Sequence, residues 1–287
     1  MFNDKREKLT EIFEDTMRLC RKDTELADAI KHTRENTKFY APDEKPDLPK
    51  QEYTRIRKTQ YNVTTERTLE AAKRLSEKYS GKRIAVLNFA SATNPGGGVA
   101  RGSSAQEESL CRCSTLYPCL KTDKLYGQFY AMHRARHDTL YTDACIYTPD
   151  IVVIKSDAFF PQAVPKSERF KVDVITCAAP NLREKPYNSM NPDQGAPTKL
   201  TPTELFDFHV KLGNHILDVA ASNGADIVVL GAFGCGAFRN DPHIVANAYG
   251  HVLCNYKSIF DEVVFAIYCS SDDTENYDIF KEVIGRV

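Results

Sequence analysis

Residues 88–108 of this 287-residue chain read NFASATNPGGGVARGSSAQEE. The apolar stretch Ile84–Asn88 predicts a short buried strand in front of the loop, and the residues from Gln106 onward predict a helix after it. A strand, a glycine-rich loop and a helix in this order form the ligand-binding turn of many α/β sheets. The adjacent carboxylates Glu107 and Glu108 open the helix, where they either carry chemistry or only stabilise the helix dipole.

A second glycine loop, GAFGCGAFRND, occupies residues 231–241 and follows the apolar run Ile227–Gly231. Asp241 and Pro242 then form a favoured N-cap and first position of another helix. Ligands of open α/β sheets bind beyond the carboxyl ends of the strands, so we expect both loops to face one crevice. Backbone N–H groups and helix N-termini there would suit a diphosphate, although each loop alone could be a purely geometric turn. Neither loop matches the P-loop or GxGxxG patterns, so nicotinamide binding has little support.

Predicted helices and strands alternate along the rest of the chain, which indicates a mixed sheet with helices on both sides. The expected helices are one or two within residues 4–39, one capped by Thr64 or Thr65 and ending near residue 79, and others at 106–120, 125–137, 204–221, after Asp241, and at 276–284. The expected strands are 55–63, 84–88, 146–154, 172–177, 227–231 and 263–268. Three prolines within residues 40–50 predict a linker. We therefore divide the chain into an N-terminal helical extension with its linker, residues 1–52, and a larger domain, residues 53–287.

The composition excludes several classes of protein. Lys and Arg number 38 against 39 Asp and Glu, and this balance argues against a broad electrostatic nucleic-acid binder. The nine cysteines show no zinc-site spacing, and we expect reduced thiols in an intracellular protein, cytoplasmic or nuclear. The longest apolar run, 227–238, is shorter than the roughly 18 residues that a membrane helix needs. The first residues lack the apolar core of a signal peptide, so we expect no membrane contact.

The triplet Gly96–Gly98, followed after seven residues by Gln106-Glu107-Glu108, resembles the signature of poly(ADP-ribose) glycohydrolases, a branch of the macrodomain fold. Four flanking segments are similar to the microbial type of that family: Val86–Ser91 with Asn94-Pro95, Tyr141–Asp143, Ile146–Asp150 and Gly231–Gly236. The resemblance covers about residues 60–287. It implies an α/β fold, a macrodomain-like three-layer α/β/α sandwich with a mixed central sheet and an N-terminal helical extension.

The resemblance also implies roles for individual residues. Glu108 would be the catalytic acid, and Glu107 would bind ribose hydroxyls beside the scissile bond. Phe238 would pack against the distal ribose and hold it towards Glu108, and Asn94 would be a further ribose contact. The other substrate-binding residues that we expect are Gly96, Gly97, Gly98, Gln106, Gly234, Cys235, Gly236 and Ala237. We expect Cys235 to be a small residue in a tight loop, not a nucleophile.

The chemistry of ribosyl transfer can be considered independently. Glycosidases normally place two carboxylates on opposite sides of the bond, but Glu107 and Glu108 are neighbours and are poorly placed for that. One carboxylate would then serve as acid and afterwards as base, while the ligand diphosphate could stabilise the cation. A helix N-terminus favours an ionised carboxyl group, whereas the negative charges of Glu107 and of the diphosphate favour a protonated one. We expect Glu108 to become a competent acid mainly when substrate is bound.

The resemblance implies an enzyme that hydrolyses ribose–ribose O-glycosidic bonds of poly(ADP-ribose) from the chain ends and releases ADP-ribose. One alternative is an ADP-ribosyl hydrolase acting on mono-ADP-ribosylated nucleic acid or protein. Another is a non-catalytic module that binds ADP-ribose, although the intact Gln106-Glu107-Glu108 favours an enzyme. The expected partners are ADP-ribose or poly(ADP-ribose) on modified proteins and ADP-ribosylated nucleic acid, and we expect a monomer without metal or cofactor. His133 and His137 have ligand-like spacing but no third ligand, and we expect them on a surface or substrate-facing side of their helix.

Overall fold

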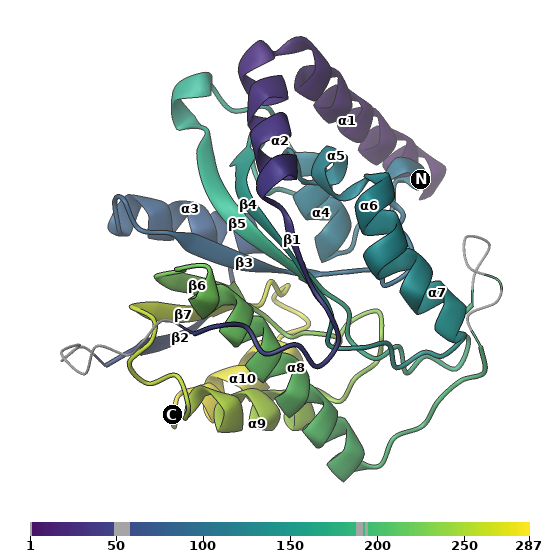
Figure 1. Ribbon diagram of the computed structural model, residues 1–287, viewed down its shortest axis with the longest axis vertical. Coiled ribbons are helices and arrows are strands. Elements are labelled where there is room, and N and C mark those ends of the chain that lie inside the picture. Colours follow the sequence, from purple (N-terminus) through teal and green to yellow (C-terminus); the bar gives the residue numbers. More distant parts are fainter. Residues whose placement is uncertain (1, 49–57, 188–191, 193–194) are drawn as a thin grey trace.

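The structure, a computed structural model, describes residues 2–48, 58–187, 192 and 195–287 (Figure 1). Its seven-stranded sheet has the order β1-β4-β5-β3-β6-β7-β2. The strands are β1 (Lys38–Tyr40), β2 (Gln60–Thr64), β3 (Ile84–Phe89), β4 (Cys145–Val153), β5 (Phe170–Cys177), β6 (Ile227–Leu230) and β7 (Glu262–Ala266). Strand β4 is antiparallel to β1 and to β5, and all other pairs are parallel. The carboxyl ends of β5, β3, β6, β7 and β2 therefore meet at one edge of the sheet.

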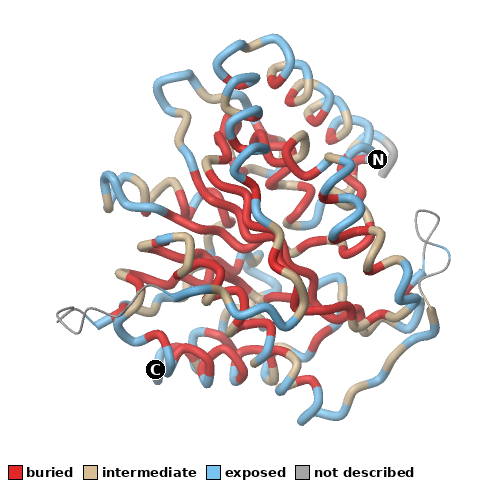
Figure 2. The backbone as a smooth tube through the Cα atoms, in the orientation of Figure 1, coloured by how far each residue is buried: buried red, intermediate tan, exposed pale blue. Residues whose placement is uncertain are grey.

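The side chains of each central strand alternate between two hydrophobic cores. In β3, Ile84 and Val86 belong to one core, and Ala85 and Leu87 belong to the other. The first core packs under α1 (Phe2–Lys22), α2 (Thr24–Asn36), α3 (Thr68–Lys78), α4 (Gln106–Cys113), α5 (Leu116–Leu120), α6 (Asp123–Leu125) and α7 (Met132–Arg136). The second packs under α8 (Pro202–Ser222), α9 (Pro242–Leu253) and α10 (Glu275–Ile284). The buried backbone follows the sheet and the inner sides of these helices, which confirms the three-layer α/β/α sandwich (Figure 2).

The N-terminal helices share the core of the larger domain. Phe13 of α1 and Ile30 of α2 are buried in the same cluster as Val86 of β3. The chain then forms β1, in which Phe39 pairs with Ile146 of β4, where the sequence analysis expected helix. The division after residue 52 lies outside the described residues, as do residues 55–57 of the expected strand 55–63, and the structure places this strand at Gln60–Thr64 as β2.

Three expected helices differ in detail. Helix α3 begins at Thr68 instead of after Thr64, because Thr64 is still paired in the sheet with Ala266. The helix expected over 106–120 is broken at Ser114, which bridges to the end of β4 and separates α4 from α5. The helix expected over 125–137 contains a π-helical segment, η2 (Tyr126–Ala131), before α7. A 3-10 turn, η1 (Val99–Arg101), follows the glycine triplet.

The predicted start of α9 is confirmed. Asp241 is its N-cap, and the carboxylate accepts hydrogen bonds from the backbone N–H groups of His243 and Ile244 at 2.8 and 3.3 Å. Among the helices of the described ranges, none is both long and apolar enough to cross a membrane.

Candidate active site

Gln106 fixes the start of α4 against the carboxyl end of β3. Its side-chain Oε1 accepts a hydrogen bond from the N–H of Phe89 at 2.9 Å, and its Nε2 donates to the carbonyl of Leu87 at 2.7 Å and to Oγ1 of Thr68 at 3.1 Å. The amide thus ties α4 to β3 and α3, and the next two residues, Glu107 and Glu108, lie where the parallel strands end. Both amide donors of Gln106 are used within the protein, although the resemblance suggests a substrate contact.

The carboxylate of Glu107 is held beneath the first loop. Glu107 is only 3% exposed, and its Oε2 accepts a hydrogen bond from the N–H of Ser91 at 2.7 Å. Its Oε1 lies 3.4 Å from Nδ2 of the buried Asn88. Burial, and next the charge of Glu108, raise the pKa of Glu107 well above its usual value, against the opposing effect of these N–H donors. The repulsion between the two neighbouring carboxylates therefore acts on the pKa of Glu107 and favours its protonated form.

The neighbouring carboxylate of Glu108 has one bound and one unbound oxygen. Its Oε1 accepts a hydrogen bond from the N–H of Gly98 at 2.9 Å, and the residue is 7% exposed. Its Oε2 has no hydrogen-bond partner among the described residues, and such a buried atom calls for a partner. One oxygen thus orients the group while the other can exchange a proton with a bound molecule.

A buried cation supports this helix from behind. Arg112 lies one turn after Glu108 on α4, and its Nη1 donates a hydrogen bond to the carbonyl of Ser103 at 2.5 Å. Burial lowers the pKa of Arg112, and the charge of Glu108 opposes that effect. The guanidinium therefore holds the far end of the glycine loop and contributes positive charge near the carboxylates.

The glycine triplet is required by close packing around the two carboxylates. A Cβ at Gly97, where φ is +56°, would lie 2.5 Å from Oε1 of Glu108, and one at Gly98 would clash with Oγ of Ser103. A Cβ at Gly96 would meet the ring of Tyr117 at 2.6 Å. The N–H of Gly97 donates to the carbonyl of Asn94 at 2.9 Å, and that of Gly98 is used by Glu108. These two N–H groups are therefore used within the loop, and an anion would have to be bound by other donors.

Asn94 stands at the turn before the triplet and is oriented by an arginine. Arg134 of α7 donates from Nη2 to Oδ1 of Asn94 at 2.6 Å and from Nε to the carbonyl of Thr93 at 2.8 Å. The sequence analysis assigned no role to Arg134. Its contact with the loop depends on the path of the chain between α4 and α7, and no short-range pattern encodes that path.

The second loop, residues 231–241, offers unused backbone donors. The N–H groups of Gly234, Gly236, Ala237 and Phe238 have no acceptor in the described part of the chain. The loop is kept in shape by Asn240, whose Nδ2 donates to the carbonyl of Pro180 at 2.7 Å. Consecutive N–H groups of this kind bind anions well. At the N-terminus of α9, the carboxylate of Asp241 accepts hydrogen bonds from the N–H groups of His243 and Ile244.

Phe238 and Cys235 differ in character within this loop. The ring of Phe238 is half-buried, and its centre lies 6.4 Å from that of Tyr141 and 5.7 Å from the guanidinium carbon of Arg183. The Sγ of Cys235 lies 3.8 Å from the carbonyl of Phe233, and burial raises the pKa of the thiol. A thiol in its neutral form is a poor nucleophile.

The structure corrects the expectation for His133. This residue is buried, and its two ring nitrogens lie 2.9 Å from the carbonyl of Phe129 and 2.9 Å from Oγ1 of Thr142. Burial lowers the pKa of His133 to about 4, so the ring is neutral and structural. His137 ends α7 with a left-handed backbone conformation. Within the described residues, no group of three His, Cys, Asp or Glu side chains could hold a metal ion.

Tyr268 is a candidate that the sequence analysis did not single out. It follows the carboxyl end of β7 and is 59% exposed, and the guanidinium carbon of Arg67 lies 3.8 Å from the centre of its ring. Arg67 comes just after β2, so the pair lies at the sheet edge to which the glycine loops belong. An aromatic residue at the end of the strand predicted over 263–268 was the available signal.

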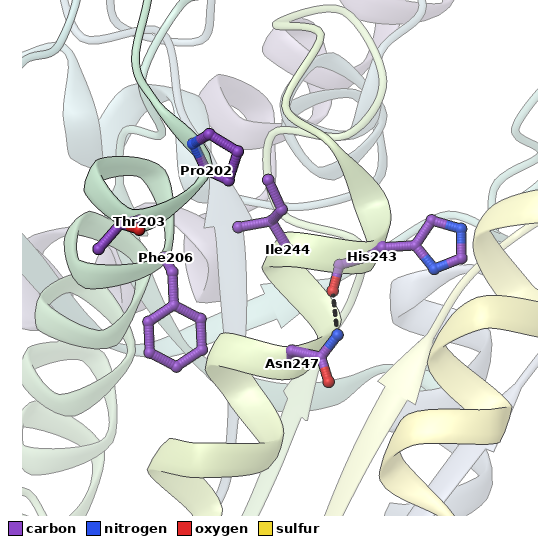
Figure 3. Close-up of a pocket in the computed structure, with 6 residues that line it drawn as sticks. All are labelled: Pro202, Thr203, Phe206, His243, Ile244 and Asn247. Carbon is purple, nitrogen blue, oxygen red and sulfur yellow. Dashed lines mark hydrogen bonds between the residues drawn. The ribbon is translucent and has the colours of Figure 1, made fainter.

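A cavity of about 320 Å³ lies apart from the carboxylates, between the first turns of α8 and α9 (Figure 3). Its lining residues are Pro202, Thr203, Phe206, His243, Ile244 and Asn247. The side chain of His243 points away from the other lining side chains, and Nδ2 of Asn247 donates to the His243 carbonyl at 2.8 Å. The cavity therefore presents mainly apolar surface and little that would recognise an anion.

The chain is similar to known poly(ADP-ribose) glycohydrolases (PARG). A family model described as microbial-type PARG, catalytic domain, matches residues 7–156. The structure of PARG from Thermomonospora curvata is 29% identical with a TM-score of 0.82, and the match covers 97% of this chain and 100% of that one. The same enzyme bound to the inhibitor ADP-HPD is 30% identical with a TM-score of 0.80, covering 96% and 99%.

A second bacterial enzyme gives a similar match. The structure of PARG from Deinococcus radiodurans in complex with ADP-ribose is 34% identical with a TM-score of 0.74, and the match covers 90% of this chain and 97% of that one. A comparison with curated protein sequences finds no match.

Proposed function

The chain belongs to the microbial-type poly(ADP-ribose) glycohydrolase family, and on this premise we propose that it hydrolyses ribose–ribose O-glycosidic bonds of poly(ADP-ribose) and releases ADP-ribose. The observation that carries this proposal is the unpartnered Oε2 of Glu108, held in place through Oε1 by Gly98. The preferred substrate is the end of a polymer attached to a modified protein, and the enzyme acts as a monomer. Its nine free thiols support a cytoplasmic or nuclear location.

The substrate is expected to span the sheet edge between the two loops. The diphosphate accepts hydrogen bonds from the N–H groups of residues 236–238, and Phe238 packs against the distal ribose. Asn94, oriented by Arg134, contacts a ribose hydroxyl, and the glycine triplet and Cys235 line the crevice. The adenine stacks on the exposed ring of Tyr268.

The reaction then uses one carboxyl group twice. Glu108 transfers a proton from Oε2 to the oxygen of the leaving ribose as the bond to the distal C1″ breaks. The resulting carboxylate removes a proton from water as the water oxygen attacks C1″, which returns Glu108 to its acid form. The developing cation is stabilised by the substrate diphosphate. Glu107 binds the ribose hydroxyls beside the bond, and Gln106 is a positioning residue for both glutamates.

Replacement of Glu108 by Gln tests the catalytic assignment. Glu108→Gln should lower kcat by about 10²- to 10⁴-fold, the usual contribution of a general acid, and should leave the Kd for ADP-ribose largely intact. Glu77→Gln makes the same change at an exposed position of α3 and should behave as the wild type. Full turnover by Glu108→Gln would refute the role of this carboxyl group.

The wild-type enzyme and three substrates test the reaction itself. Automodified polymer, mono-ADP-ribosylated protein and mono-ADP-ribosylated DNA are incubated separately, and released ADP-ribose is measured by chromatography. Release from polymer without early oligomers supports cleavage at chain ends. Release only from a mono-modified acceptor would instead identify an ADP-ribosyl hydrolase, and binding without release would identify a binding module.

A further inference from the structure

Arg183 lies in the segment between β5 and α8 and has no part in the mechanism described above. Its Nε donates a hydrogen bond to Oδ1 of Asn181 at 2.9 Å, and its Nη2 donates to the carbonyl of Pro186 at 3.0 Å. Asn181 is fully buried, and its backbone N–H donates to the carbonyl of Thr139 at 2.7 Å. The guanidinium is therefore held in one orientation before any ligand binds.

This fixed cation has no counter-ion in the described structure. No carboxylate of the described ranges forms an ion pair with Arg183, and its Nη1, which carries two N–H donors, has no acceptor there. Two other half-buried arginines are paired with carboxylates: Arg74 lies 2.7 Å from Glu66, and Arg169 lies 2.9 Å from Asp23. An ordered, half-buried and unpaired guanidinium is costly to maintain unless a ligand supplies the opposite charge.

The guanidinium borders the proposed substrate crevice. Its carbon lies 5.7 Å from the centre of the Phe238 ring, and the N–H of the preceding residue, Leu182, donates to the Phe238 carbonyl at 2.9 Å. The N–H groups of Gly236, Ala237 and Phe238 belong to the same short segment and also have no acceptor among the described residues. Cationic and neutral N–H donors thus gather around Phe238, and all of them suit an anion.

We infer that Arg183 is a substrate-binding residue whose Nη1 contacts a phosphate of the ADP-ribose chain. A guanidinium is well matched to phosphate oxygens in charge and geometry. This inference rests on the proposed function, because it takes its ligand from the same crevice. The phosphate belongs either to the terminal unit that is cut off or to the unit beyond the scissile bond, and the two are separated by the choice of ligand below.

The test compares Arg183→Gln with Arg183→Lys and with a control, Arg286→Gln. Arg286 is an exposed C-terminal arginine, so its replacement removes the same charge far from the crevice. Arg183→Gln should raise KM for polymer about 10-fold, as expected for a lost charged hydrogen bond, with little change in kcat. The KM of Arg183→Lys should lie between those of the wild type and Arg183→Gln, because lysine keeps the positive charge but lacks the planar pair of N–H donors of the guanidinium. Added salt should weaken binding by the wild type more than by Arg183→Gln.

The Kd for free ADP-ribose identifies the phosphate. A parallel loss of affinity for free ADP-ribose assigns the contact to the terminal unit, whereas an unchanged Kd with a raised KM for polymer assigns it to the unit beyond the bond. If KM, Kd and salt dependence of Arg183→Gln all match those of Arg286→Gln, the inference is wrong.

Binding in a second background separates this inference from the proposed function. Polymer and ADP-ribose affinities are measured for Glu108→Gln with and without Arg183→Gln, so that turnover plays no part. Wild-type enzyme that fails to cut polymer would refute the proposed function. The affinities would still test whether Arg183 contacts a phosphate. A weaker affinity in the double variant supports the phosphate contact, and equal affinities refute it.

Discussion

At Gly97 the backbone conformation and the space around Cα together exclude any side chain. The φ of +56° disfavours other residues, and a Cβ would displace Oε1 of Glu108. Gly81 has a φ of +79° and open space around it, so it isolates the cost of the backbone alone. This pair allows the catalytic consequence of the close contact to be separated from general strain.

We predict that Gly81→Ala loses about 1 kcal/mol of stability, because alanine is strained in the left-handed region, and that Gly97→Ala loses more, because its Cβ also displaces Glu108. Only Gly97→Ala should also lose most of kcat, since Glu108 must move. Urea denaturation and steady-state turnover measure the two effects. Normal turnover by Gly97→Ala would show that the orientation of Glu108 matters little.

Tyr268 provides a prediction about the base. Tyr268→Ala should raise the Kd for ADP-ribose by about 5- to 100-fold, as for other lost aromatic stacks on a base, while kcat at saturation stays near the wild-type value. Tyr268→Phe keeps the ring face and should bind almost normally. Calorimetric titration with ADP-ribose distinguishes these outcomes, and unimpaired binding by Tyr268→Ala would remove this residue from the adenine site.

Helix α4 shows how one element delivers the catalytic groups. Gln106 ties its first turn to β3, and Asp157 ties its middle by accepting hydrogen bonds from Oγ of Ser109 at 3.0 Å and from the N–H of Leu69 at 2.8 Å. Both tethers also contact the first turn of α3, at Thr68 and Leu69. Together they set the height of Glu108 relative to the glycine loop.

Loss of the first tether should uncouple turnover from binding. Gln106→Met has a similar length but leaves the N–H of Phe89 and the carbonyl of Leu87 without partners, at a cost of about 1–3 kcal/mol in stability. We predict a fall in kcat with a smaller change in the Kd for ADP-ribose. Equal losses in both quantities would instead indicate direct contact between Gln106 and the substrate.

The sequence predicted elements well where a local signal and the final packing agree. The cap and first proline of α9 are encoded within two residues, Asp241 and Pro242, and the structure confirms them. Strand β1 was missed because Lys38–Tyr40 becomes a strand only through its pairing with β4. The N-cap position of α3 was misplaced because the pairing of Thr64 with β7 is equally non-local. In the candidate site, Glu107 and Glu108 follow from a motif, whereas Arg183 and Tyr268 depend on tertiary structure.

Buried histidines give the whole molecule a predictable response to acid. Burial lowers the pKa values of His133 and His209 to about 4, while an unfolded chain has histidines near 6.5. The unfolded state therefore binds more protons between pH 6.5 and 4, and stability should fall as pH falls through this window. Each residue can contribute a slope of up to about 1.4 kcal/mol per pH unit.

Denaturation in urea at a series of pH values tests this prediction. His209→Gln should reduce the pH dependence of the free energy of unfolding between pH 6.5 and 4. The same change also weakens the 2.7 Å contact with Asn240 and lowers stability at pH 7. Identical slopes in the wild type and His209→Gln would show that His209 is not buried in its neutral form.

The pairing of β2 with β7 has a consequence for biosynthesis. Asn62 of β2 donates a hydrogen bond to Glu262 of β7 across 200 positions of the chain. At about 5–20 residues per second, the ribosome needs roughly 10 to 40 s to make the partner after β2 has been synthesised. Throughout that interval β2 is a nascent strand without its neighbour, and β1 likewise waits for β4. Both edges of the sheet are thus closed by early segments whose partner strands are synthesised later, so the hydrogen-bonding groups of these segments remain unpaired in the nascent chain.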